Sequence, residues 1–234
     1  MNPLVRKIIE SESLSDRDIF ECRGMDYTFL NPVSYLEARE CPDIFLRMRG
    51  VFADGNLLAK AIDLKHGSMV SRRSFDMTSL AGRLFIHASD TGKSVYFVGA
   101  SDEEIGSAGD IIGRQYPRLD IAGMRGGYFR DACEVKSACE EIVRRNPAFV
   151  IVGMGVCRQE KFLAALRSAG YGGIGFTCGG FFSQLAAYGL DYYPRWVNRL
   201  NLRFIYRFIK EPHTRRRYVS AFFKFPLKFL TSAD

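Results

Sequence analysis

Short apolar runs alternate with segments of helical periodicity along residues 25–177 of the chain. Runs rich in β-branched and aromatic residues predict strands, at residues 25–30, 50–53, 94–98, 119–122, 149–153 and 174–177. The segments between them predict helices, at residues 32–38, 56–62, 76–91, 103–114, 131–145 and 159–168. Because strands and helices alternate, the pattern predicts an α/β fold with a parallel sheet covered by helices on both faces.

Residues 195–234 follow a different pattern. Arginines spaced by four predict one basic ridge of a helix, beside a ridge of large apolar side chains; the two ridges are Arg195, Arg199, Arg203, Arg207 and Trp196, Leu200, Phe204, Phe208. Pro212 ends this helix, and the stretch 221–230 places phenylalanines among lysines. We therefore divide the chain into a body of residues 1–194 and a C-terminal appendage of residues 195–234.

The positive charge of the chain lies in this appendage. The formal net charge is +7, and the appendage holds ten basic and two acidic side chains against 23 and 24 in the body. A basic, aromatic segment is typical of binding to an anionic membrane surface. We expect the first appendage helix to pack on the body, with its arginine stems along the apolar surface and their charged groups in water, and the Phe-rich stretch to contact lipid. No nucleic-acid-binding motif accompanies the ridge, so nucleic acid is not an expected partner.

The composition is that of a globular protein, with 47% hydrophobic and 25% charged residues. No segment reaches the roughly 20 apolar residues that a membrane-spanning helix needs, and no signal peptide is recognisable. Six cysteines are present without a CxxC pair, which indicates a reduced, cytoplasmic chain rather than a disulfide scaffold.

Glycine or a small polar residue follows almost every predicted strand. Ligands of parallel sheets bind beyond the carboxyl ends of the strands, where glycine and helix N-termini favour phosphate groups. Ordinary turn glycines would explain any one of these positions, but together they predict a phosphate-bearing ligand. They are Asn31, Asp54, Gly55, Gly99, Gly126, Gly127, Gly153, Gly155 and residues 178–180. Neither a GxGxxG nor a GxxxxGK[ST] motif occurs.

Asp54 is the first candidate for chemistry, because it follows a strand and could act as a general base at the rim of the sheet. The alternative is an N-cap for the helix that begins near Asn56. Gln159 could donate to a sugar or base, or lie on a solvated helix N-terminus. Arg72 or Arg73 could pair with a pyrophosphate, or belong to a surface loop. No Cys/His spacing resembles a metal site, so no metal is expected.

Five segments resemble the WecG/TagA/CpsF glycosyltransferase family and together cover roughly residues 25–225: VFADGNLL (51–58), VYFVGAS (95–101), YPRLDIAGMRGGYF (116–129), FVIVGMGVCRQEKFL (149–163) and PRWVNRLNLRFIYRFIKEP (194–212). The resemblance implies a Rossmann-like body and an appendage that binds the membrane and completes the active site. It implies an inverting, metal-independent hexosyl- or N-acetylhexosaminyltransferase. Such an enzyme moves a sugar from a nucleotide-sugar donor, usually a UDP-sugar, to a polyprenyl-diphosphate-linked acceptor.

The resemblance further implies a cytoplasmic protein at the inner face of the cell membrane, acting in cell-surface or exopolysaccharide biosynthesis. The nucleotide sugar is a substrate, so no cofactor is expected, and the appendage leaves room for a homo-oligomer. The family's catalytic base falls on Asp54, and Asn31 matches an active-site asparagine. Donor-binding positions fall on Tyr128, Gln159, Gly127, Gly155 and one of Arg72 and Arg73, with diphosphate-binding arginines among Arg207, Arg215, Arg216 and Arg217.

Two positions depart from the family pattern. Phe29 stands where the family has a threonine, and Ser183 stands where it has a late aspartate. These departures motivate an alternative hypothesis, a catalytically silent peripheral membrane protein that binds a nucleotide or a sugar phosphate.

Overall fold

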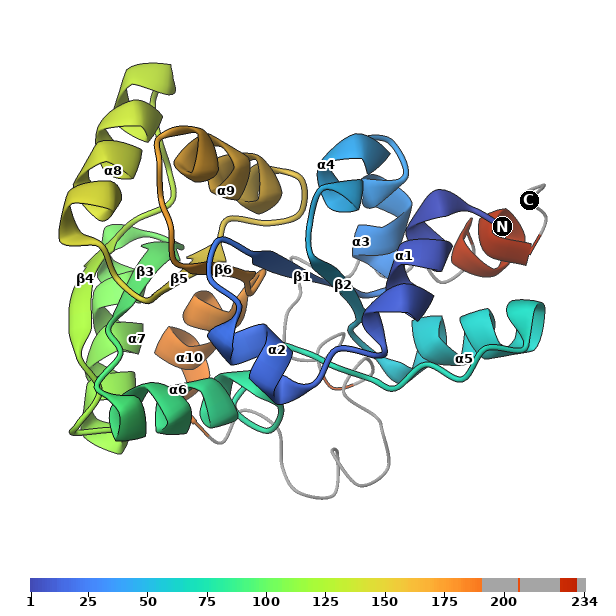
Figure 1. Ribbon diagram of the computed structural model, residues 1–234, viewed down its shortest axis with the longest axis horizontal. Helices are drawn as coiled ribbons and strands as arrows, with labels where there is room; N and C mark the ends of the chain where they lie inside the picture. Colours follow the sequence, from blue (N-terminus) through green and yellow to red (C-terminus); the bar gives the residue numbers. More distant parts are fainter. Residues whose placement is uncertain (191–205, 207–223, 231–234) are drawn as a thin grey trace.

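The computed structural model describes residues 1–190, 206 and 224–230 of the chain. Within these residues six strands form one parallel sheet in the order β2-β1-β6-β5-β3-β4 (Figure 1). The strands are β1 (Asp26–Leu30), β2 (Gly50–Ala53), β3 (Val95–Gly99), β4 (Ile121–Arg125), β5 (Phe149–Gly153) and β6 (Ile174–Thr177).

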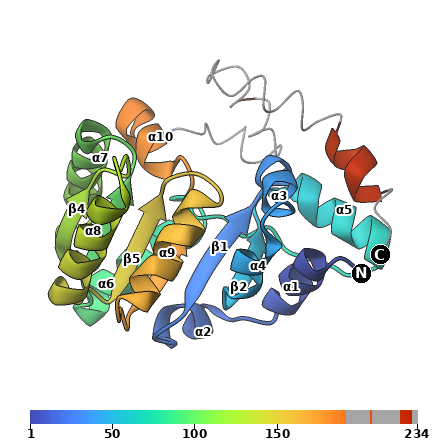
Figure 2. The same cartoon turned by 90° about the horizontal axis from the view of Figure 1, so that it is seen from above.

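Helices connect the strands and cover both faces of the sheet (Figures 1 and 2). They are α1 (Pro3–Ser11), α2 (Asp16–Glu21), α3 (Pro32–Ala38), α4 (Pro42–Leu46), α5 (Asn56–His66), α6 (Leu80–Thr91), α7 (Asp102–Gln115), α8 (Ala132–Arg145), α9 (Arg158–Ser168) and α10 (Phe181–Tyr188). The predicted α/β fold is therefore confirmed, and a single parallel sheet with helices on both faces makes it Rossmann-like.

Local sequence explains where several helices begin. Ser15, Asn31 and Ser101 each accept a hydrogen bond from a backbone N–H one turn into the helix, and a polar side chain three residues on bonds back to the cap. Such capping boxes satisfy backbone groups that a helix start leaves unpaired. α5 and α6 end at Gly67 and Gly92, which adopt the left-handed conformation that favours glycine.

Alternating side chains of the strands build two separate apolar layers. Tyr27 and Phe29 of β1 face the layer that contains α2, α6, α7 and α10. Leu30 faces the opposite side, where α1, α3, α4 and α5 pack near β1 and β2, and α8 and α9 cover β3 and β5 on that same side. Because all strands except the edge strand β4 are almost completely buried, they appear as nearly continuous apolar runs in the sequence.

All six predicted strands are present, with β4 shifted by two residues. The helix predicted over 76–91 begins only at Leu80, because Asp76 bonds the backbone and hydroxyl of Thr78 and forms a turn instead. The predictions omitted α1, α2, α4 and α10.

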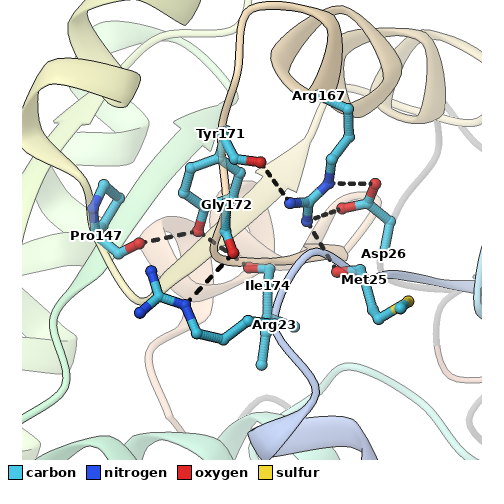
Figure 3. A network of polar contacts seen from close by, with 8 residues as sticks. All are labelled: Arg23, Met25, Asp26, Pro147, Arg167, Tyr171, Gly172 and Ile174. Carbon is cyan, nitrogen blue, oxygen red and sulfur yellow. Dashed lines mark hydrogen bonds and ion pairs between the residues drawn. The ribbon is translucent and has the colours of Figure 1, made fainter.

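A polar network ties the start of β1 to the end of α9 (Figure 3). The Arg167 guanidinium donates to both carboxylate oxygens of Asp26, at 2.9 and 2.7 Å. The same side chain donates to the carbonyl oxygens of Met25 and Tyr171. The network therefore fixes the α9–β6 loop against β1 at the amino edge of the sheet.

The helix of residues 224–230 packs on the body beside α1, α3 and α5 (red in Figure 1). Phe225 and Phe229 are 1% and 2% exposed and contact the ring of Tyr35. The expectation that the Phe-rich stretch contacts lipid is therefore wrong for these two phenylalanines, because an apolar face of the body is available to bury them. The predicted appendage helix that ends at Pro212 and residues 221–223 of the Phe-rich stretch lie outside the described residues, apart from Tyr206.

The structure joins Cys41, at the start of α4, to Cys157, at the start of α9, in a disulfide whose Cα atoms lie 7.2 Å apart. Cys22, Cys133, Cys139 and Cys178 are free. The expectation of reduced cysteines is thus wrong for this pair. Folding brings together cysteines 116 positions apart, which their spacing in the sequence did not reveal.

Candidate functional site

Asn31 and Asp54 lie next to each other in the fold, directly after two paired strands. Leu30 of β1 is in register with Ala53 of β2, and the Asp54 N–H donates to the Leu30 carbonyl oxygen at 2.8 Å. Both residues follow the carboxyl ends of their strands, so the structure brings the two predicted catalytic residues to one edge of the sheet.

The cap role that the sequence left open for Asp54 is taken by another residue. The N-cap of α5 is Gly55, with φ of 115°, a residue without a side chain to cap the helix. Asp54 itself is partly exposed at the rim. A partly exposed carboxylate at this rim is accessible to a ligand, which is one condition for a general base.

Asn31 caps α3 with its side-chain oxygen. This oxygen accepts from the N–H groups of Val33 and Ser34, at 2.9 and 3.0 Å. The amide orientation is set by these two bonds, which leave the Asn31 NH2 group as the part of the side chain suited to a ligand.

Gln159 and Glu160 occupy the first turn of α9, after the strand β5 in the middle of the sheet. Gln159 is 3% exposed and Glu160 is fully buried, so the interpretation of a solvated helix N-terminus is wrong. Cys157 precedes them with a φ of 66°, a strained value for a residue with a side chain and one that clusters near functional sites.

The glycines at the strand ends mostly pack against one another. A Cβ on Gly99, whose φ is +146°, would lie 2.3 Å from the Gly153 carbonyl oxygen. A Cβ on Gly127 would lie 2.8 Å from the Gly99 Cα. These glycines let three adjacent loops approach closely, which is a structural reason for them. Gly155 adopts a left-handed φ of +78° in the turn before α9.

The two adjacent arginines differ in their partners. Arg73 donates to the backbone carbonyls of Leu14 and Glu12, and its guanidinium lies over the Phe52 ring. These contacts stabilise the fold. Arg72 forms an ion pair with Asp76 at 2.8 Å, and its side chain is 23% exposed. Of the two arginines, only Arg72 is paired with a carboxylate of the described residues, that of Asp76, and an anionic ligand could take the place of this carboxylate.

Tyr128 is 74% exposed and follows β4 at the same edge of the sheet. The predicted diphosphate-binding arginines, Arg207, Arg215, Arg216 and Arg217, lie outside the described residues.

A cavity of about 480 Å³ lies at the opposite, amino edge of the sheet, where Lys7, Arg49 and Arg167 are among its lining residues. None of the candidate catalytic or donor-binding residues lines it. Across residues 1–190, 206 and 224–230, no cluster of three or more His, Cys, Asp or Glu side chains has the arrangement of a metal site. No helix in that part of the chain is long and apolar enough to cross a membrane.

Comparison with known proteins gives a family for this arrangement. The model of the "Glycosyl transferase WecG/TagA/CpsF family" matches residues 16–233. The chain is 31% identical over 204 residues to "UDP-Gal:alpha-D-GlcNAc-diphosphoundecaprenol beta-1,4-galactosyltransferase" of Shigella boydii, which covers 87% of this chain and 85% of that protein.

Two further relatives match a shorter part. "N-acetylglucosaminyldiphosphoundecaprenol N-acetyl-beta-D-mannosaminyltransferase" of Bacillus subtilis (strain 168) is 32% identical over 133 residues, 57% of this chain and 50% of that protein. A protein of the same name from Bacillus spizizenii is 29% identical over the same length.

Proposed function

Because the chain belongs to the glycosyl transferase WecG/TagA/CpsF family, we propose that it transfers a sugar from a UDP-sugar to N-acetylglucosaminyl-diphospho-undecaprenol. The names of all three relatives contain this acceptor, whereas the transferred sugar is galactose in one and N-acetylmannosamine in the others. The acceptor is therefore the better supported substrate. The donor sugar is proposed as galactose, because the galactosyltransferase matches the larger share of the chain.

One observation carries the assignment of the site. Asp54 and Asn31 follow the paired strands β2 and β1 at the carboxyl edge of the sheet, and Gln159 lies on the first turn of α9, which follows β5 at the same edge. In the proposed reaction the Asp54 carboxylate accepts the proton of the acceptor hydroxyl. The hydroxyl oxygen bonds to the anomeric carbon as the bond from that carbon to UDP breaks, and UDP leaves with the electron pair.

A single displacement of this kind inverts the anomeric centre. UDP-galactose is α-linked, so inversion gives a β product, in agreement with the β linkages in the names of the relatives. Charge on the departing UDP would be stabilised by cationic side chains, for which Arg72, Arg207, Arg215, Arg216 and Arg217 are the proposed sources.

The test is Asp54→Asn, which removes the base and keeps the shape of the side chain. Transfer to a synthetic lipid-linked N-acetylglucosamine acceptor should fall by about 10²–10⁴-fold, while the affinity for UDP stays within about threefold. Asp63→Asn, an exposed change on α5, is the control and should leave transfer unchanged. Undiminished transfer by Asp54→Asn would reject Asp54 as the base.

The donor is tested by giving the wild-type protein UDP-galactose and UDP-N-acetylmannosamine in parallel. Transfer of galactose would support UDP-galactose as the donor. Transfer of N-acetylmannosamine instead would reject it and identify UDP-N-acetylmannosamine as the donor. Binding of UDP without transfer from any nucleotide sugar would instead favour the silent binding protein.

A further inference from the structure

A buried polar cluster lies beneath the candidate site, between the sheet and the start of α9. Thr28 of β1, Thr177 of β6 and Glu160 of α9 are all 0% exposed, in an interior that is mostly apolar. Polar groups are costly to bury unless they are hydrogen-bonded, so each member of this cluster needs a structural or functional reason to be there.

The hydrogen bonds of the cluster run toward one oxygen atom. The Thr177 hydroxyl donates to the Thr28 hydroxyl at 2.8 Å, and the Thr28 hydroxyl donates to Glu160 Oε1 at 2.7 Å. Gln159 Nε2 donates to the same Oε1 at 3.0 Å. Glu160 Oε1 is therefore a double acceptor.

The Gln159 amide is held at both ends. Its nitrogen donates to Glu160, and its oxygen accepts the Gly179 N–H at 3.1 Å. These two bonds fix which way the amide faces. An amide nitrogen carries two N–H groups, so one N–H of Gln159 remains for a further acceptor.

The second oxygen of Glu160, Oε2, is buried and has no hydrogen-bond partner. Burial raises the pKa of Glu160, against smaller opposing effects of Thr28, Gln159 and the backbone N–H groups of Cys157 and Glu160 itself. No charged side chain among the described residues figures in this balance. A proton on Oε2 leaves Oε1 as a carbonyl-type acceptor, which matches the two donors that it receives.

We propose that Glu160 is a positioning residue of the proposed glycosyl transfer: as a neutral carboxyl group it orients the Gln159 amide, so that the remaining N–H donates to an oxygen of the nucleotide-sugar donor. The inference rests on the proposed function. Glu160 itself is shielded from the ligand by its complete burial and acts only through Gln159.

The decisive pair of variants is Glu160→Gln and Glu160→Met. Glutamine presents the same acceptor oxygen without ionising, so the dissociation constant of UDP-galactose, measured by calorimetry, should stay within about threefold of the wild-type value. Methionine has a similar volume but no acceptor for the Gln159 amide. Without that hydrogen bond the amide is no longer oriented toward the donor, and the affinity for UDP-galactose should fall by roughly tenfold. Wild-type affinity in Glu160→Met, or a tenfold loss in Glu160→Gln, overturns the proposal.

A double-mutant cycle separates positioning from a general packing role. If Glu160 acts through the amide, Glu160→Met should weaken donor binding no further once Gln159→Ala is present. Additive effects of the two changes would overturn the proposal. Because binding is measured without transfer, Asp54→Asn serves as the reference that loses transfer and retains binding. A wild-type protein that binds no UDP-sugar rejects the proposed function itself.

The neutral state of Glu160 is tested by measuring thermal stability against pH. This test needs only the wild-type protein and Glu160→Gln, so it remains available if Glu160→Met does not fold. A glutamate in the unfolded chain ionises near pH 4.3. If the folded protein keeps Glu160 protonated above that pH, the unfolded state binds fewer protons and wild-type stability declines as pH rises. The melting temperature of Glu160→Gln relative to wild type should therefore increase from about pH 5 to about pH 8. A flat or falling difference means that Glu160 is ionised and overturns the proposal.

Discussion

Asp26 and Arg167 form a bidentate ion pair whose side chains are only 11% and 20% exposed. Two parallel N–H···O bonds give such a pair both strength and direction. The remaining guanidinium N–H bonds go to backbone carbonyls (Figure 3), so the pair joins β1, α9 and the loop before β6. Its contribution is structural, at the edge of the sheet opposite Asp54.

We expect Arg167→Met to lower the free energy of unfolding by about 2–4 kcal/mol, because it leaves the Asp26 carboxylate mostly buried without its cation. Urea denaturation measures this loss. Arg118→Met breaks an ion pair whose side chains are 76% and 55% exposed, and it should cost at most about 1 kcal/mol. Equal losses in the two variants would contradict the structural role of Arg167.

Single residues show how far the sequence predicts the site. Asp54 and Asn31 could be placed at strand ends from apolar runs alone, but their adjacency depends on the pairing of β1 with β2. The burial of Glu160 could not be predicted from its position at a helix start. The available signal was Thr28 and Thr177, polar residues inside strands that are otherwise apolar and buried on both faces.

At the scale of elements, the omitted helices share an identifiable cause. α2 and α4 are short, and α1 and α10 lie outside the strand–helix alternation on which the prediction rested. Capping signals were nevertheless present, since Asn2 with Pro3 begins α1 and Ser15 with Asp18 begins α2. The strand-end glycines were interpreted as ligand contacts, whereas packing of one loop backbone on another accounts for Gly99 and Gly127.

The helix of residues 224–230 is held by side chains of the body at both its apolar face and its C-terminal end. Arg39 donates to the Lys228 carbonyl and Lys65 to the Phe229 carbonyl, each at 3.0 Å. These cations satisfy carbonyls that the last turn of a helix leaves unpaired and complement the helix dipole.

Phe229→Ala should release this helix from the body, because truncating a buried phenylalanine costs about 3–5 kcal/mol. Hydrogen exchange of the amides in residues 224–230 should accelerate by at least about 100-fold. Leu230→Ala, at a side chain that is 50% exposed, is the control and should leave exchange nearly unchanged. Unaltered protection in Phe229→Ala would mean that other contacts hold the helix.

At the scale of the whole molecule, the contrast between a nearly neutral body and a basic appendage predicts how the protein meets a membrane. Each cation near an anionic surface contributes about 1 kcal/mol of binding. Replacing Arg215, Arg216 and Arg217 with glutamine should weaken binding to vesicles that contain anionic lipid by about 100-fold. Co-sedimentation measures the change.

The matched control replaces three exposed arginines of the body with glutamine, Arg6, Arg17 and Arg114. Its net charge equals that of the appendage variant, so an equal loss of vesicle binding would show that total charge, rather than the appendage, governs the interaction. A strong dependence on salt is expected for the wild-type protein in either case.

One apolar cluster contains Leu4 and Val5 from the beginning of the chain and Phe225 and Phe229 from near its end. During synthesis this cluster stays incomplete until residues 224–230 have left the ribosome, while the layer around α6, α7 and α10 draws on earlier segments. Translation that stops short of residue 224 would leave the Tyr35 ring without its aromatic neighbours. Nascent chains of that kind should be preferred clients of chaperones, and termination before residue 224 should yield aggregates rather than a shortened enzyme.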